Sequence, residues 1–355
     1  MRDGIEVQMS HRISWMKLMC AFMVVVIHSQ FLAEKAGWIR EFVMYGVCRC
    51  AVPFFFAVSG YFLSRHMDED KWWRKEVGKR ILGLGIPYFI FVCSFMILSY
   101  FIEGVFPNLK IMLKDIGADP RVTPLLAPLW YVRALFILIL LSPLLKKIVR
   151  GGSCIASIIG IISIAIICFL VRAYSDCSSG TWYLLLNYGF SLEGLLYFSI
   201  GMFLAGHKLN GIASTIINKL YGLLFVTVGF ILFAIRAYLL LYTEYEWQAC
   251  KIGFFAIPFM TLGLFAIMPR CSLPSMLNSA SFPIYVLHFF ILSLLGGRIS
   301  RGGGGWFEPD ASLLHWLLRI VVAFFGSIII AAMLSRFCPR VSAFIFGGRL
   351  STRKY

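Results

Sequence analysis

Two histidines lie inside apolar stretches of this chain, where an ionisable side chain is unusual. His28 stands near the end of the apolar run 13–31, and His288 lies within the run 280–297. Histidine exchanges a proton near neutral pH, so a buried imidazole can act as a general base. In a lipid-spanning helix such a ring is costly unless it faces a polar cavity or a partner. The sequence therefore leaves two interpretations of His28: a base in a buried site, or an interfacial histidine hydrogen-bonded to a neighbouring helix. For His288, the alternative is a satisfied polar residue of the core.

Charged residues in other apolar runs are the next candidates. Five arginines and one glutamate lie in such runs: Arg49, Arg133, Arg172, Arg236, Arg319 and Glu193. Guanidinium groups bind anionic or hydroxylated substrates and stabilise developing oxyanions. We expect several of them to line one polar cavity that opens to the outside, with Arg133 as the first candidate for stabilising an oxyanion. The alternative is that each arginine extends along its helix to the lipid headgroups.

Ten apolar segments must position these residues. The chain has 355 residues, 60% of them hydrophobic, and a mean hydropathy of +0.83. A membrane-spanning helix needs about 20 mostly apolar residues. We therefore predict an all-α polytopic integral membrane protein with about ten transmembrane helices, at 14–32, 43–64, 81–102, 128–147, 154–172, 190–206, 219–241, 249–268, 280–297 and 312–335. Residues 1–340 are expected to form a single membrane domain, followed by a basic cytoplasmic tail, 341–355.

Lysine and arginine predict the orientation of these segments. With the N-terminus in the cytoplasm, the inner segments hold 20 Lys and Arg residues and the outer loops hold 8. This bias predicts that both termini are cytoplasmic. The net charge of +16 lies mostly in these short loops, so we expect no nucleic-acid partner. No small-residue cleavage site follows the first run, which predicts an uncleaved helix. The segment 340–346 has the pattern of a short amphipathic segment on the inner surface.

The ten cysteines do not predict a metal centre. Most lie in hydrophobic runs, where a free thiol behaves as a small apolar group. Cys48 and Cys50 form a C-x-C pair without further metal ligands nearby. Cys177 and Cys250 fall in loops predicted to be outside, where the two can form a disulfide or remain free.

Three short motifs place polar groups in apolar surroundings. They are Phe55-Phe56-Ala57-Val58-Ser59-Gly60, Leu129-Trp130-Tyr131 and Tyr285-Val286-Leu287-His288. Each alone has a structural explanation: Ser-Gly permits close helix packing, and Trp130-Tyr131 is typical of an interfacial aromatic belt. With Lys17 eleven residues before His28, however, they resemble in type and order the membrane acyltransferase-3 family over essentially the whole chain.

The resemblance implies transfer of an acyl group, usually acetyl from acetyl-CoA, to a hydroxyl of an envelope glycan or lipid-linked sugar. It implies a multi-pass protein of the bacterial inner membrane, with acyl-CoA as co-substrate and no permanently bound cofactor. It makes His28 the catalytic candidate. Two positions depart from the family pattern: Ser14 and Lys17 replace Asp-x-x-Arg, and Gly83 replaces a second arginine after Arg80. Relatives with such a looser pattern include succinyl-type transferases and the membrane part of serine racemases, so the acyl group is expected to be acetyl or succinyl.

The predicted site has two parts. The loop 65–80 carries six Lys and Arg residues and is expected to hold CoA phosphates, with Ser59, Lys79 and Arg80 as donor ligands; its alternative role is a topology signal. The acceptor is expected to contact Trp130, Tyr131, His288, Glu193, Arg49, Arg172, Arg236 and Arg319. His28 then acts as a general base or forms an acyl-histidine. Two other function classes stay open at this stage: a transporter or flippase of a glycan or small anion that uses the arginines as its binding site, and a non-catalytic sensor or anchor.

Overall fold

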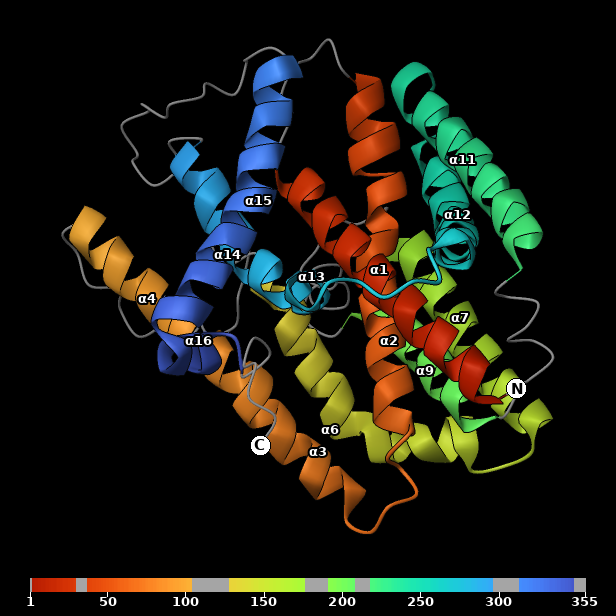
Figure 1. Cartoon of the computed structure of the whole chain (residues 1–355). Coiled ribbons are helices and arrows are strands. Elements are labelled where there is room, and N and C mark those ends of the chain that lie inside the picture. The colour runs from red at the N-terminus through yellow and green to blue at the C-terminus, as the bar shows by residue number, and fades with distance from the viewer. Residues whose placement is uncertain are drawn as a thin grey trace.

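The fold is a bundle of helices, seen here in a computed structural model that describes residues 2–29, 37–103, 128–175, 191–207, 218–295 and 313–347. Within these ranges every regular element is helical, so the predicted all-α class is confirmed (Figure 1). The order of elements is α1 (Arg2–His28), η2 (Ile39–Met44), η3 (Val47–Cys50), α2 (Ala51–Ser64), α3 (Trp72–Arg80), η4 (Ile81–Gly85), α4 (Ile86–Glu103), α6 (Trp130–Arg150), α7 (Cys154–Ser175), α9 (Leu192–Gly206), α11 (Lys219–Tyr242), α12 (Glu246–Ile267), α13 (Ser275–Ser279), α14 (Ser281–Leu295), α15 (Leu313–Phe337) and α16 (Pro339–Ile345).

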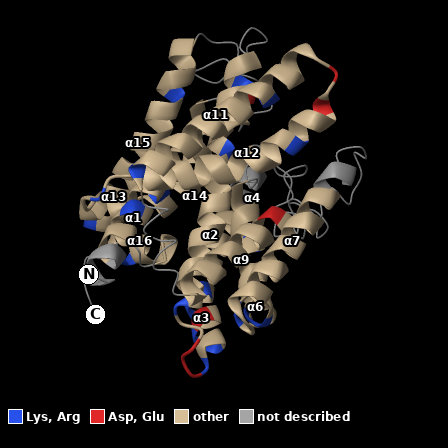
Figure 2. Ribbon diagram, turned by 90° about the vertical axis from the view of Figure 1, so that its right-hand side faces the viewer, with Lys and Arg blue, Asp and Glu red and all other residues tan. Residues whose placement is uncertain are grey.

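Each of the ten predicted apolar segments overlaps a helix. In the described part of the chain, 7 helical segments are long and apolar enough to cross a membrane, and α9 and α14 are shorter apolar helices. The remaining segment is α6, which has 21 residues and is more polar because it carries Lys147 and Arg150 in its last turn. Charged residues gather near helix ends and are sparse in the middle of the bundle (Figure 2). The protein is thus a multi-pass membrane protein, whereas ten crossings and cytoplasmic termini stay predictions.

Two segments predicted as loop and tail contain short helices. Residues 72–80 of the basic loop form α3, which continues through the π-helix η4 into α4. Trp73 anchors α3 to α6, because its Nε1 donates to the Ile139 carbonyl at 3.3 Å. The tail begins with α16, in which Val341 and Phe344 are exposed, while Phe346 just beyond it is buried. Placement of α16 at the inner membrane surface stays a prediction.

Glycines allow α2 and α9 to pack at very short range. A Cβ atom on Gly60 would lie 2.1 Å from the Phe198 carbonyl oxygen, and one on Gly201 would lie 1.9 Å from that of Ala57. No side chain fits at these distances, so the two backbones touch directly. Small residues are the usual means of close helix packing in membranes, where apolar burial between helices adds little. This contact fixes α2, which carries Ser59, relative to the rest of the bundle.

Helix α1 ends at His28 and is held at two points, at Arg12 within the helix and at Ser29 just beyond it. The Arg12 side chain is completely buried and donates to the carbonyls of Phe265 and Ala266, which belong to the last turn of α12. Such carbonyls have no partner within their own helix. Directly after His28, Ser29 Oγ accepts a hydrogen bond from Trp316 Nε1 of α15 at 2.8 Å. These contacts hold His28 at a defined position between α14 and α15.

Candidate functional site

The site is centred on a contact between the two histidines that the sequence singled out. His288 Nε2 of α14 lies 3.2 Å from His28 Nδ1 of α1, and the two ring centroids are 5.2 Å apart. The Phe289 ring packs edge-on against His28, with its centroid 5.3 Å away. His288 is fully buried, whereas His28 is partly exposed. The His28 ring thus faces a polar partner on a neighbouring helix, which both interpretations of this residue allow.

Backbone carbonyls define which nitrogen of each ring carries a proton. His28 Nδ1 lies 2.9 Å from the Val24 carbonyl oxygen, and His288 Nδ1 lies 2.8 Å from that of Ile284. A carbonyl oxygen only accepts, so each Nδ1 must be the donor. In the neutral rings both Nε2 atoms therefore carry a lone pair. His28 Nε2, the atom that a general base needs, is left without a proton and can receive one.

Three tyrosines lie between the histidine pair and the start of α6. The Tyr285 ring is 6.4 Å from the His288 ring and 5.8 Å from the Tyr131 ring. The Tyr285 hydroxyl donates to the Pro128 carbonyl and is hydrogen-bonded to the Val132 backbone. It interacts electrostatically with Tyr88 of α4 as well as Tyr131, and Tyr88 interacts with Arg133. Arg133 thus lies within electrostatic range of Tyr88, which is itself within range of Tyr285.

A cavity of about 460 Å³ adjoins Tyr285, and residues from all three motifs contribute to its lining. Its walls come from α1, α2, α3, η4, α6, α13 and α14. Its polar lining residues are Lys17, Ser59, Arg80, Tyr131, Asn278, Ser279, Ser281 and Tyr285. Ser59 Oγ and the Tyr131 hydroxyl lie 3.4 Å apart across it. The cavity therefore combines two cations with hydroxyl groups, and it carries no Asp or Glu among its lining residues.

Some of these residues could not be selected from the sequence as site residues. Asn278 and Ser279 come from α13, and Ser281 opens the polar stretch that leads to Tyr285 and His288, but none of the three was predicted as a ligand. Lys17 was recognised through its spacing from His28 and not as a ligand. The only available signal for the serines was a polar cluster immediately before an apolar run, which is equally typical of an ordinary helix start.

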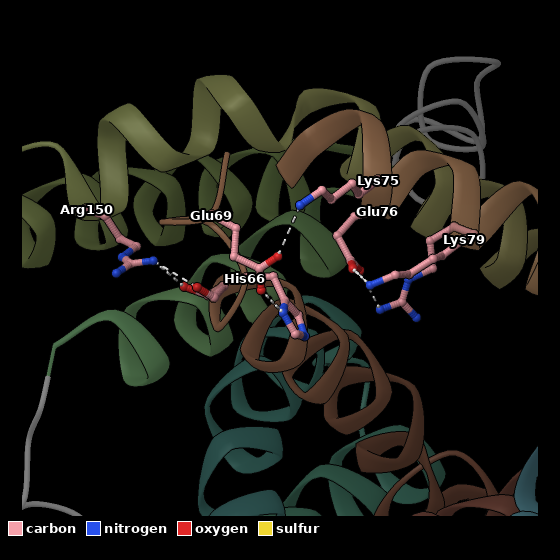
Figure 3. Close-up of polar contacts among 8 residues, drawn as sticks. His66, Glu69, Lys75, Glu76, Lys79 and Arg150 are labelled. Carbon is pink, nitrogen blue, oxygen red and sulfur yellow. Dashed lines mark hydrogen bonds and ion pairs between the residues drawn. The ribbon is translucent and has the colours of Figure 1, made fainter. Parts of the chain in front are cut away.

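Three of the six Lys and Arg residues in the basic loop 65–80 form ion pairs with acidic residues of the same loop. Lys79 Nζ lies 2.7 Å from Glu76 Oε1, and Lys75 Nζ lies 3.8 Å from Glu69 Oε2 (Figure 3). A hydrogen bond from His66, together with the positive charge of Lys75, holds the pKa of Glu69 below its usual value, so this carboxylate stays charged. Of the predicted donor ligands, Ser59 and Arg80 line the cavity, whereas Lys79 is exposed and does not.

Asp68 and Glu76 extend this network to α6 and to the cavity. Arg150 Nη2 of α6 lies 2.9 Å from Asp68 Oδ2 (Figure 3). The Glu76 side chain is buried and also lies 3.5 Å from Arg80 Nη2. Glu76 thereby holds the Arg80 guanidinium at the cavity wall.

The other acceptor candidates are placed on several helices. Arg236 of α11 is buried, donates to the Glu41 carbonyl at 2.9 Å and forms an ion pair with the Glu41 carboxylate at 3.6 Å.

Arg49 is exposed on η3, and Arg319 is buried on α15, one turn from Trp316. Glu193 lies in the first turn of α9. The side chain of Arg172 lies outside the described residues. The shared outward-open cavity lined by arginines stays a prediction.

The remaining aromatic candidates lie at the start of α6. Tyr131 packs on the Phe56 ring at 4.7 Å, and Trp130 packs on the same ring at 6.3 Å. Within the described part of the chain, no group of three His, Cys, Asp or Glu side chains could hold a metal ion. Cys250 lies in α12, whereas Cys177 lies outside the described residues, so their pairing stays a prediction.

Fold and site together define a multi-pass membrane protein with an imidazole pair beside a cationic cavity. The sequence profile of a family described as an acyltransferase domain, acyltransferase-3, matches residues 10–336. The chain therefore belongs to the acyltransferase-3 family, as its motifs indicated.

A curated relative is the succinoglycan biosynthesis protein ExoH of Rhizobium meliloti (strain 1021). It is 30% identical to this chain over 166 residues, which cover 41% of this chain and 44% of the relative. The match thus spans less than half of either protein. No solved structure matches the chain significantly.

Proposed function

We propose that this protein transfers an acyl group, acetyl or succinyl, from acyl-CoA to a hydroxyl of a cell-envelope glycan, with His28 as the general base. The observation that carries the proposal is the pair of contacts that His28 Nδ1 makes with the Val24 carbonyl and His288 Nε2. These contacts favour the tautomer in which Nδ1 carries the proton and Nε2 can accept one. The family supplies the reaction class. The transporter interpretation receives no comparable support.

In the proposed reaction, His28 Nε2 takes the proton of the acceptor hydroxyl as its oxygen attacks the thioester carbonyl carbon. The resulting tetrahedral oxyanion is stabilised by a guanidinium group. Arg133 is the first candidate because its charge interacts electrostatically with Tyr88, which neighbours Tyr285. The carbon–sulfur bond then breaks, and the protonated His28 returns its proton to the CoA thiolate. A covalent acyl-His28 intermediate is the chemical alternative.

The cavity is the proposed donor site. Lys17 lies eleven residues before His28, which corresponds to roughly 16 Å along a helix. An extended pantetheine arm has a comparable length, so CoA phosphates near Lys17 and Arg80 would place the thioester close to the histidines. Ser59, Tyr131 and the α13 hydroxyls supply hydrogen bonds along the way. The loop 65–80 contributes Arg80 to this site, whereas its Lys75 and Lys79 form ion pairs with Glu69 and Glu76.

The acceptor is proposed to be an envelope polysaccharide or a lipid-linked sugar. Support comes from the name of the relative, a protein of succinoglycan biosynthesis. It also comes from the partly exposed position of His28 at the end of α1 that is predicted to be outside. We accordingly propose that the protein lies in the bacterial inner membrane, with its donor cavity towards the cytoplasm.

Incubation of the purified protein with acyl-labelled CoA and a glycan acceptor tests this function. We expect the label to become covalently attached to the glycan. Liposomes that accumulate intact glycan or anion, without label transfer, would support a transporter instead.

Replacing Lys17 or Arg80 with alanine should raise KM for acyl-CoA. Each variant loses a charged contact with the CoA phosphates that is worth about 1.5–3 kcal/mol, which corresponds to a roughly 10- to 100-fold rise in KM for acyl-CoA. KM for the glycan should change little, and the defect should grow smaller at high salt, where the wild-type contact is itself screened.

Lys79→Ala is the matched control, because Lys79 neighbours Arg80 on α3 and has the same charge but points outside the cavity. The Lys79→Ala variant should have the same KM for acyl-CoA as the wild-type protein. Equal defects in Lys79→Ala and Arg80→Ala would indicate general surface charge and contradict the cavity as the donor site.

A further inference from the structure

We propose that His288 is a positioning residue that works through His28 and does not contact either substrate. The proposal rests on the function proposed above, in which His28 is the base. The sequence suggested a different role, in which His288 helps to bind the acceptor. The distances, burial and hydrogen bonds of the pair favour the new role.

Both nitrogens of His288 are already used inside the protein. Its Nδ1 donates to the Ile284 carbonyl at 2.8 Å, and its Nε2 faces His28 Nδ1 at 3.2 Å. The side chain has 0% exposure and lies against the rings of Phe289 and Tyr285. A substrate therefore finds neither a free nitrogen nor an open path to this ring.

The direction of the hydrogen bond between the rings follows from the carbonyls. His28 Nδ1 carries the proton, because it also contacts the Val24 carbonyl at 2.9 Å. His288 Nε2 must then be the acceptor, since two protons do not fit between nitrogens 3.2 Å apart. The His28 proton is shared between Val24 and His288, which fixes both the tautomer and the ring angle. His288 is neutral in this arrangement.

A neutral acceptor suits this position in the bundle. When His28 Nε2 takes the acceptor's proton, the ring becomes positive and its Nδ1–H becomes a stronger donor. The lone pair of His288 Nε2 stabilises that charge as it develops. A carboxylate would stabilise it more, but would have to be buried as a permanent charge between apolar helices. His288 instead supplies an acceptor without a charge to bury.

Two substitutions of similar shape test this role. His288→Gln keeps an acceptor near the position of Nε2, whereas His288→Met fills the space without one. We expect His288→Met to lower kcat roughly 10- to 100-fold with KM for acyl-CoA and glycan within about 2-fold of wild type. His288→Gln should recover most of that loss. For both variants, kcat is calculated from the amount of protein that is monodisperse in detergent.

The outcomes separate the possible roles. A raised KM for the glycan in both variants would show a substrate contact and overturn the proposal, as would equal kcat in both variants. If His288→Met does not fold, His288→Asn replaces it, because its shorter amide does not reach His28; activity equal to that of His288→Gln would again overturn the proposal. Absence of acyl transfer in the wild-type protein would instead contradict the proposed function itself.

Discussion

His28→Ala is expected to eliminate acyl transfer while leaving a folded protein. Removing a general base lowers the rate by roughly 10²- to 10⁴-fold, and a lost nucleophile would lower it at least as much. The fold should persist, because α1 is held by Arg12 and Ser29 and not by the imidazole. The measurement is label transfer from acyl-CoA to glycan, normalised to protein that elutes as a single species in detergent.

The matched control is His66→Ala, which removes a histidine from the loop before α3. His66 contacts Glu69 at 2.7 Å and lies outside the cavity and the histidine pair. Its transfer rate should equal that of wild type. Substantial activity in folded His28→Ala would remove the base role, whatever the behaviour of the control.

The histidine pair illustrates how far the sequence could lead. The apolar runs predicted the helices, since length and hydropathy are local properties of the chain. The polar residues in those runs were also visible as candidates. The contact itself joins residues 260 positions apart, and no local pattern encodes it. The sequence therefore identified both members of the pair but not their hydrogen bond, and so it assigned His288 to the acceptor.

For the charged residues, the sequence shows where basic side chains lie but not which of them are already paired within the protein. In the sequence, the loop 65–80 was notable for its six Lys and Arg residues, and Glu193 was the acidic residue found within the apolar segments. Helix α3 brings Glu69 and Glu76 against the loop's own lysines, and η2 brings Glu41 against Arg236. Pairing depends on which side chains share a face or a helix contact, so a count of basic residues overestimates the charge available to a ligand.

Substitutions of the neighbouring residues Ser59 and Gly60 are expected to have different effects, one on acyl-CoA binding and the other on folding. Gly60→Ala should abolish folded protein, since its Cβ would lie 2.1 Å from the Phe198 carbonyl oxygen. Backbone cannot retreat as a flexible side chain does, and overpacking of this kind costs about 3 kcal/mol or more. Ser59→Ala should fold normally and raise KM for acyl-CoA, because Ser59 lines the cavity and lies 3.4 Å from the Tyr131 hydroxyl.

Gly78→Ala supplies the control for the glycine substitution, because a Cβ there would meet nothing within 4 Å. Alanine favours a helix over glycine, so this variant should be at least as stable as wild type. Thermal stability of the detergent-solubilised variants measures the difference. A folded, active Gly60→Ala would mean that α2 and α9 lie further apart than described, and Ser59 would then no longer be held opposite Tyr131. Because the same two helices fix the packing and the cavity wall, loss of the close contact should appear in stability first and in donor binding second.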